Sequence, residues 1–256
     1  MGIAMNYQTL KVTYQKAVQR IQIYRPEANN SINSQMISEL SFALQAVEDE
    51  EKTRVLVLEG LPDVFCTGMD FEEITRGKTE KVDHEASFNG YYNILKQISQ
   101  SNKVTVSLVQ GKVQAGGVGL VAASDLVIAG PNATFVLSEL LFGLLPACVL
   151  PFLIRRVGFQ KAYRLAITTQ SISITDAYNW GLVDEYDDNT DMLLSKYIRR
   201  LKCLPASGVK ELKEYIKDLW VIQEETQHLA VNKASSLIID PSVQEKLKAL
   251  KKEGIL

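Results

Sequence analysis

The sequence lacks the features that mark several large classes of protein. Its 28 lysine and arginine residues stand against 30 aspartate and glutamate residues, so no basic excess indicates nucleic-acid binding. No apolar run approaches the roughly 20 residues that a membrane-spanning helix needs. The first residues, Met1 to Asn6, show no basic-then-apolar leader. Together these absences predict a cytoplasmic protein with neither a nucleic acid nor a membrane as its partner.

Cysteine is scarce as well. Cys66, Cys148 and Cys203 are odd in number and lack the spacing of metal ligands, so neither a disulfide framework nor a metal site is expected. Packing roles in a reducing compartment suit them better. No internal repeat or low-complexity linker divides the 256 residues, which predicts one large domain, or one domain with a helical extension.

Short β-type runs alternate with helical patterns along the first two thirds of the chain. Residues 10–14, 17–24 and 55–59 are predicted to be strands, and the chain after Asp191 is predicted to be almost entirely helical. Such β-then-α units favour parallel strands joined by crossover helices. The polar segment 72–87 is expected to be a solvated loop, with a mobile lid as the alternative.

The most informative stretch is residues 103–147. A β-rich run ends in the glycines Gly116, Gly117 and Gly119, which open an apolar helix, and Glu139 follows as a lone acid among apolar residues. Backbone N–H groups at the start of a helix favour negative charge, and a desolvated carboxylate can move a proton beside a carbonyl group. The alternative is a helix start with packing glycines, followed by a glutamate on the surface.

Seven motifs occur in a fixed order: RPEANNSIN, VFCTGMDF, GKVQAGGVGL, SDLVIA, FVLSELLFGLLPA, RRVG and ISITDAYNWGLVDE. In this order and spacing they resemble the crotonase, or enoyl-CoA hydratase/isomerase, superfamily, over roughly residues 10–190. The resemblance implies an α/β fold, the crotonase fold. This fold is a spiral of ββα units, here over residues 1–190, with a helical region over residues 191–256 that packs in trimers.

The resemblance also implies an active site. Its oxyanion hole consists of the backbone N–H groups of Met69, in CTGMD, and Gly116, in AGGVG, which would hold a thioester enolate. Glu139 is implied as the general base. The other catalytic glutamate of the family's hydratases falls on Gly119, which predicts chemistry with a single base. Asp70 is a second catalytic candidate, as a proton donor, with a structural role as the alternative.

The longer motifs most closely resemble one subgroup, the dehydratases of polyketide β-branching cassettes. This implies that 3-hydroxy-3-methylglutaryl, held on the phosphopantetheine of an acyl carrier protein, is converted to the 3-methylglutaconyl thioester. It implies no further cofactor and no metal, and it makes the carrier and the other β-branching enzymes partners. Glu27 stands where CoA-using members often have a basic residue, which favours a carrier-bound substrate over free CoA.

Substrate binding leaves several residues open. The distal carboxylate of the substrate needs a cation or hydrogen-bond donors, and the sequence does not rank the candidates for this role. Together with Gly117 of the glycine cluster, the substrate-binding candidates are Arg76, Lys78, Lys81, Tyr91 and Tyr92.

Three other functions stay open. An enoyl isomerase of the family can work with one glutamate at the Glu139 position. A methylglutaconyl-carrier decarboxylase of the family uses a lid lysine and a C-terminal histidine. Lys78 and His228 lie in comparable regions, but the surrounding motifs do not match that subgroup, and a surface lysine and a packed helix histidine are the favoured explanation. The third alternative is a catalytically silent scaffold.

Two apolar stripes in the C-terminal region need to be covered. They consist of Leu193, Leu194, Tyr197, Ile198 and Leu201, and of Leu212, Tyr215, Ile216, Leu219 and Trp220. We expect these stripes to form the contact of a homotrimer, or of a dimer of trimers. The alternative is that the helices fold back onto their own core.

Overall fold

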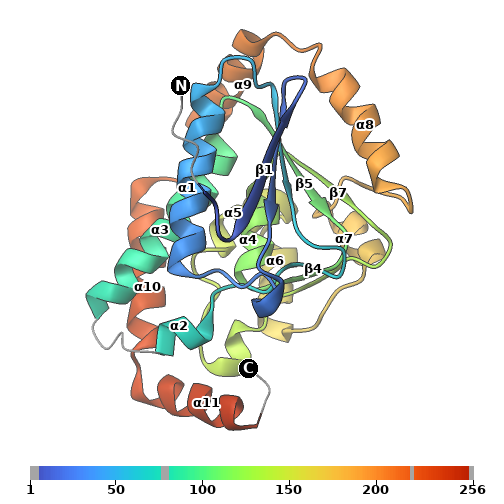
Figure 1. The fold of residues 1–256 in the computed structure, drawn as a ribbon. Helices are drawn as coiled ribbons and strands as arrows, with labels where there is room; N and C mark the ends of the chain where they lie inside the picture. The colour runs from blue at the N-terminus through green and yellow to red at the C-terminus, as the bar shows by residue number, and fades with distance from the viewer. Residues whose placement is uncertain (1–5, 76–80, 220–221, 254–256) are drawn as a thin grey trace.

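Two sheets form the frame of the protein in the computed structural model, which describes residues 6–75, 81–219 and 222–253 (Figure 1). The larger sheet has the order β1-β2-β3-β5-β7-β9, and only the β1–β2 pair is antiparallel. Its strands are Leu10–Gln15 (β1), Val18–Ile23 (β2), Val55–Glu59 (β3), Val104–Val109 (β5), Leu126–Ala129 (β7) and Glu185–Tyr186 (β9).

The smaller sheet is wholly parallel, in the order β4-β6-β8. Its strands are Val64–Cys66 (β4), Lys112–Gln114 (β6) and Thr134–Val136 (β8). Each of the pairs β3/β4, β5/β6 and β7/β8 gives one strand to each sheet before the chain enters a helix. The predicted spiral of ββα units is therefore confirmed. The corner between β5 and β6 requires Gly111, because a Cβ there would overlap the backbone of Asp63.

Helices enclose the two sheets. α3 packs between α1 and α10, and α8 covers the opposite side of the large sheet (Figure 1). Among the described residues, no helix is both long enough and apolar enough to cross a membrane. The helices are Pro26–Ala28 (η1), Ser34–Asp49 (α1), Phe71–Thr75 (α2), Lys81–Gln100 (α3), Gly116–Ala123 (α4), Glu139–Phe142 (η2), Leu150–Val157 (α5), Phe159–Thr168 (α6), Ile174–Trp180 (α7), Thr190–Leu201 (α8), Ala206–Asp218 (α9), Glu224–Ile238 (α10) and Pro241–Lys252 (α11).

The expectation of one solvated loop over residues 72–87 is wrong. α2 occupies its start, and α3 extends N-terminally to Lys81. The carboxylate of Asp70 accepts hydrogen bonds from the backbone N–H groups of Glu72 and Glu73, which stabilises the first turn of α2. In α3, the side chain of His84 is only 2 % exposed, so part of this polar segment is packed. The polar composition of the segment concealed α2 and the N-terminal part of α3.

The two C-terminal apolar stripes have different environments. Leu193 and Leu194 of α8 pack on the large sheet beside Val55 and Val57, so this stripe folds back onto its own core. The expectation that it forms a subunit contact is wrong, because the outer face of the large sheet itself needs a cover. The α9 stripe stays open: none of its helix residues is buried, and Tyr215 is 63 % exposed. Trp220, at the end of this stripe, lies outside the described residues.

The buried side chain of Asn30 ties the ends of the two sheets together. Its Nδ2 donates to the carbonyl oxygens of Ile23, at the end of β2, and Phe65, in β4, at 3.1 and 3.0 Å. Its Oδ1 accepts the Arg25 N–H at 2.7 Å. Asn30 therefore fixes the course of β4 just before the chain reaches Met69.

Replacing Asn30 by alanine should lower the free energy of unfolding by about 2–4 kcal/mol, because buried carbonyl groups lose their donor. Asn29→Ala is the matched control, since Asn29 shares the left-handed backbone (φ 51° against 55°) but has an exposed side chain. It should cost only about 1 kcal/mol, from the backbone conformation alone. Urea unfolding with unchanged m-values measures both. Equal losses in the two variants would contradict the tie between the sheets.

Candidate active site

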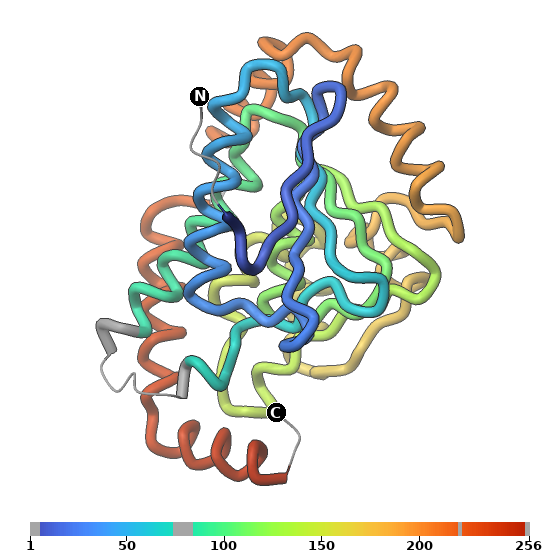
Figure 2. Tube along the Cα trace, viewed as in Figure 1, coloured from blue at the N-terminus to red at the C-terminus, as the bar shows by residue number. Residues whose placement is uncertain are grey.

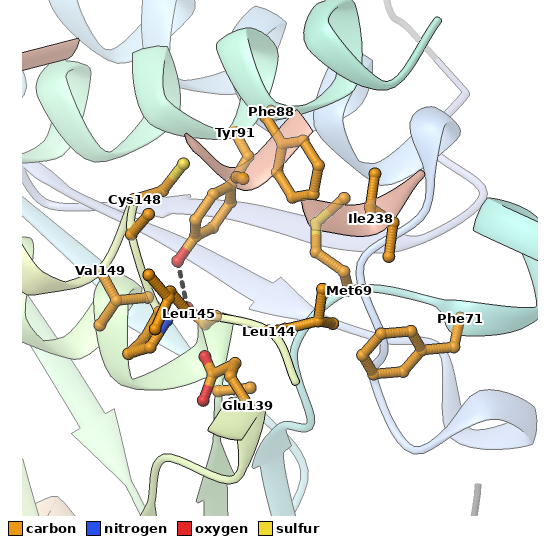
Figure 3. Close-up of a pocket in the computed structure, with 15 residues that line it drawn as sticks. Met69, Phe71, Phe88, Tyr91, Glu139, Leu144, Leu145, Cys148, Val149 and Ile238 are labelled. Carbon is orange, nitrogen blue, oxygen red and sulfur yellow. Dashed lines mark hydrogen bonds between the residues drawn. The ribbon is translucent and has the colours of Figure 1, made fainter. Parts of the chain in front are cut away.

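The three strands of the small sheet end at one edge, and a candidate site residue follows each of them. Met69 comes shortly after β4, Gly116 after β6 and Glu139 after β8. Since parallel strands bring their carboxyl ends to the same side, residues far apart in the sequence meet there. All three line one pocket, in which Figure 3 labels Met69 and Glu139.

This pocket is predominantly apolar. Its other walls come from α2, α3, the segment after η2, and α10, and they include Phe71, Phe88, Leu144, Cys148 and Ile238. Among the described residues that line it, Glu139 is the one with a charged side chain. A wall of this kind excludes water and strengthens any electrostatic interaction inside the pocket.

The backbone N–H of Met69 is directed away from the neighbouring chain segment. Ile32 donates its N–H to the Gly68 carbonyl at 2.7 Å, and Asp70 donates its N–H to the Ile32 carbonyl at 2.8 Å. Because successive residues of an extended segment alternate in direction, the N–H of Met69 faces the opposite side. Gly116 is the first residue of α4, so its N–H has no acceptor within the helix. Within the described part of the chain, neither N–H has a hydrogen-bond acceptor.

The two N–H groups are held close together by glycine. Gly68 has a φ of 90°, and a Cβ there would lie 2.7 Å from the Ala115 Cβ and 3.0 Å from the Gly116 nitrogen. Ala115 itself has a φ of 45° at the start of α4. A non-glycine residue in this region is strained, and such strain is typical of backbone that is shaped for a function. The predicted oxyanion hole thus has two neighbouring free donors.

Gly117 is a packing residue rather than a wall of the pocket. A Cβ at this position would overlap the backbone carbonyl oxygen of Cys66, at the end of β4. Gly117 does not line the pocket. Its absence of a side chain therefore lets α4 approach β4, which differs from the substrate contact that the sequence suggested.

Glu139 opens η2 and is 9 % exposed. Its Oε2 has no hydrogen-bond partner among the described residues. Burial raises the pKa of this carboxyl group to about 7, because the charged form loses its hydration. The alternative of a surface glutamate is wrong, and the expected raised pKa is confirmed. A carboxyl group with this pKa can both accept and donate a proton near neutral pH.

Two adjacent tyrosines of α3 have different environments. Tyr91 lines the pocket, and its hydroxyl donates to the Gly116 carbonyl oxygen at 2.5 Å (Figure 3). Tyr92 packs edge-on against Phe152 of α5, with ring centroids 5.2 Å apart, and does not line the pocket. Gly119 has no room for a side chain, because a Cβ there would overlap the Tyr91 hydroxyl. The sequence suggested both tyrosines as binding residues, and the structure brings only Tyr91 to the site.

The carboxylate of Asp70 is fully engaged. It pairs with the Arg25 guanidinium at 2.7 Å, and it also accepts the two N–H groups that begin α2. Burial alone would raise its pKa, but the hydrogen bonds and the Arg25 charge outweigh burial and hold the pKa below its usual value. Asp70 is therefore ionised near neutral pH, and it does not line the pocket. Of its two predicted roles, this geometry favours the structural one.

The remaining charged candidates differ in whether the structure describes their side chains. Arg76 and Lys78 lie outside the described residues, and so does the side chain of Lys81, whose backbone begins α3. His228 is exposed on α10 rather than packed, and it does not line the pocket. Glu27 is exposed and lies 3.5 Å from the Arg25 guanidinium.

Fold and site together define a member of a known enzyme family. The model of the enoyl-CoA hydratase/isomerase family matches residues 13–251. The chain belongs to this family.

Two relatives and two solved structures show the range of similarity. The chain is 42 % identical to the bacillaene synthase dehydratase PksH of Bacillus subtilis, over 94 % of this chain and 92 % of that protein. It is 29 % identical to the 1,2-epoxyphenylacetyl-CoA isomerase of Escherichia coli, over 79 % of each chain. A crystal structure of the polyketide biosynthesis enoyl-CoA hydratase pksH of B. subtilis matches with a TM-score of 0.91 and 40 % identity, covering 97 % of this chain and 99 % of that one. An enoyl-CoA hydratase of Shewanella pealeana matches with a TM-score of 0.81 and 25 % identity, covering 97 % and 95 %.

The raised pKa of Glu139 makes stability depend on pH. Between the usual carboxyl pKa of 4.5 and about 7 the folded state binds more protons than the unfolded state, so stability falls as pH rises through this window. Glu139→Gln removes the effect. The free energy of unfolding of the variant minus that of the wild type should therefore increase by up to about 3 kcal/mol when the pH is raised from 5 to 8. Chemical denaturation at the two pH values measures the gain. Glu211→Gln, on the exposed surface of α9, is the control, and a Glu139→Gln gain no larger than this control would contradict the buried carboxyl group.

Proposed function

We propose that this protein is a hydro-lyase that converts 3-hydroxy-3-methylglutaryl on an acyl carrier protein to the 3-methylglutaconyl thioester. One observation carries the proposal: a buried carboxylate with an unpartnered oxygen shares an apolar pocket with two backbone N–H groups that have no acceptor. The 42 % identity to a bacillaene synthase dehydratase supports the reaction class.

The reaction follows from these three groups. The thioester carbonyl oxygen accepts hydrogen bonds from the N–H groups of Met69 and Gly116, which stabilise the enolate as it forms. The Glu139 carboxylate removes the proton from Cα. The Cβ–O bond then breaks, and Glu139 returns its proton to the departing hydroxyl, which leaves as water. One carboxyl group is enough, because a pKa of about 7 suits both steps.

Intact-protein mass spectrometry of a carrier loaded with the hydroxymethylglutaryl group tests this reaction. Addition of the protein should remove one water, and kcat/KM should rise with pH through about 7, as Glu139 ionises. Glu139→Gln should slow water loss by roughly 10²- to 10⁴-fold, the usual size of acid–base catalysis, while Glu211→Gln should match the wild type.

Parallel assays with the matching carrier-bound substrates separate the alternatives. A decarboxylase would release carbon dioxide from the methylglutaconyl carrier, and an isomerase would move a double bond without a change in mass. A silent scaffold would change neither substrate. Any of these results without water loss would contradict the dehydratase.

The surface beside the pocket supports a carrier as the partner. α11 packs through Val243 and Leu247 against Phe142 and Leu144, next to the pocket, and turns beneath α2 (Figure 2). α11 carries four exposed lysines, Lys246, Lys248, Lys251 and Lys252, of which Lys251 pairs with Glu72, and one exposed acid, Glu245. Acyl carriers typically present an acidic helix, so this excess of lysine suits their docking. The other β-branching enzymes become partners in the proposal because they act on the same carrier-bound chain.

The carrier substrate should therefore have a higher kcat/KM than the CoA thioester, and its advantage should shrink as salt rises. Lys246→Glu with Lys248→Glu should lower kcat/KM for the carrier substrate by about tenfold, and leave that for a short pantetheine thioester unchanged. Lys202→Glu, an exposed position at the end of α8, is the control for total charge. Equal efficiency with carrier and CoA substrates at low salt would favour an ordinary CoA enzyme.

The proposal includes assembly as a homotrimer or a dimer of trimers in the cytoplasm, where free thiols such as Cys66 and Cys148 persist. The exposed apolar residues of α9, among them Leu212 and Tyr215 at 57 % and 63 % exposure, support an interface. Its area should exceed the ~1,600 Å² of a standard-size complex. Light scattering at micromolar concentration measures the mass, and a value of 28.6 kDa, that of one chain, would contradict the assembly.

A further inference from the structure

We propose that the Tyr91 hydroxyl binds and orients the substrate hydroxyl that leaves as water. This role rests on the proposed dehydration. Tyr91 reaches the pocket from the middle of α3, and Figure 3 shows its ring directed from that helix towards the Glu139 side of the pocket. Its hydroxyl is anchored on the Gly116 carbonyl oxygen, on the same residue whose N–H faces the substrate carbonyl.

The hydrogen bond to Gly116 determines whether the Tyr91 hydroxyl can donate or accept a further hydrogen bond. A phenol carries one proton, and this proton is donated to Gly116, so the oxygen presents only lone pairs to any other neighbour. Burial raises the pKa of Tyr91 well above its usual value, and the nearby Cys148, Cys66 and Glu139 raise it further, so the group remains a neutral phenol. It is therefore a hydrogen-bond acceptor for a hydroxyl, and neither a base nor an acid in the reaction.

An acceptor here sets the direction of the substrate's β-hydroxyl. When this hydroxyl donates its proton to the Tyr91 oxygen, its own lone pairs are left to face Glu139. The proton that Glu139 took from Cα then passes to that lone pair as the Cβ–O bond breaks and the Cα–Cβ double bond forms. Water leaves, Glu139 is again ionised, and Tyr91 keeps its own proton throughout.

The residues packed around the Tyr91 hydroxyl leave space for this hydroxyl beside Gly119. A Cβ at Gly119 would overlap the hydroxyl, whereas its next neighbours, Leu95 Cδ1 and Val149 Cγ2, would lie 3.2 Å away. The absence of a side chain at Gly119 therefore accommodates the hydroxyl of Tyr91 rather than its ring. A side chain introduced at position 119 therefore tests the role of the Tyr91 hydroxyl without removing that hydroxyl.

Tyr91→Phe removes the acceptor and keeps the ring. We expect kcat for dehydration to fall about 10- to 100-fold, the range expected for one hydrogen bond in a desolvated site, with KM changed less than threefold. The substrate deuterated at Cα gives the decisive readout. If breakage of the Cβ–O bond becomes the slow step, the primary isotope effect of the wild type should shrink towards one.

Tyr92→Phe is the matched control, because it removes the same atom from the next residue of α3. Tyr92 is fully buried, its hydroxyl has no partner among the described residues, and it lies away from the pocket. We expect unchanged kcat, KM and isotope effect in this variant. It also reports any general response of α3 to the loss of a buried hydroxyl.

Gly119→Ala tests the packing. Alone it should displace the Tyr91 hydroxyl and lower kcat as Tyr91→Phe does, while adding it to Tyr91→Phe should lower kcat by less than about threefold further. Such non-additivity is expected when two changes remove one interaction.

The outcomes distinguish failure of the proposed function from failure of the Tyr91 role. Wild-type protein that releases no water from the carrier substrate overturns the proposed function, and this role with it. A dehydrating wild type with an equally fast Tyr91→Phe variant overturns the role alone. A slow Tyr91→Phe variant that keeps the full isotope effect also overturns it, because the hydroxyl would then act only on the framework of the site.

Discussion

The parallel pairing of three short strands, β4, β6 and β8, is the constraint on which the site depends. Each strand ends at the same edge, and Met69, Gly116 and Glu139 follow these ends. No pair of these residues is close in the sequence, so the ladder of the small sheet alone makes them neighbours. The spiral repeats this geometry. Each turn contributes one strand to the small sheet, and a site residue follows the end of that strand.

The site holds several groups in conditions that folding alone would avoid. Glu139 is buried with an unpartnered oxygen, and Ala115 has a positive φ. Each of these features destabilises the fold. The surroundings offset them with fully satisfied interactions at the base of the site, where Asn30 bonds to both sheets and Arg25 binds Asp70. These contacts fix the turn that carries Met69, so the free N–H groups keep their place.

The apolar wall gives these groups their chemistry. In water a glutamate is a weak base with a low pKa, and a backbone N–H is already hydrogen-bonded. Inside the pocket the pKa of Glu139 lies near 7, and the backbone N–H groups of Met69 and Gly116 have no hydrogen-bond acceptor among the described residues. Tyr91 adds the remaining polar atom, held by Gly116 itself. Gly119, where the resemblance places the second glutamate of the family's hydratases, has no room for a side chain, because the Tyr91 hydroxyl occupies the space beside α4.

The sequence by itself determined the β-then-α organisation, the glycine cluster and Glu139, while the spiral and the pairing of Met69 with Gly116 came from the family resemblance. These features are local patterns: a buried strand such as VLVLE, the glycines that open α4 and a lone acid among apolar residues. Each can be interpreted from neighbouring residues in the sequence, without knowledge of tertiary contacts. Only the tertiary structure decided that Tyr91 and not Tyr92 faces the pocket, that Asp70 is held by Arg25, and that the α8 stripe is covered while the α9 stripe is open. Each of these depends on contacts between segments that are distant in the chain. The sequence does not show which residues form such a contact. The type of a side chain determines which groups it can bind, but only the packing of the chain determines which of them lie beside it.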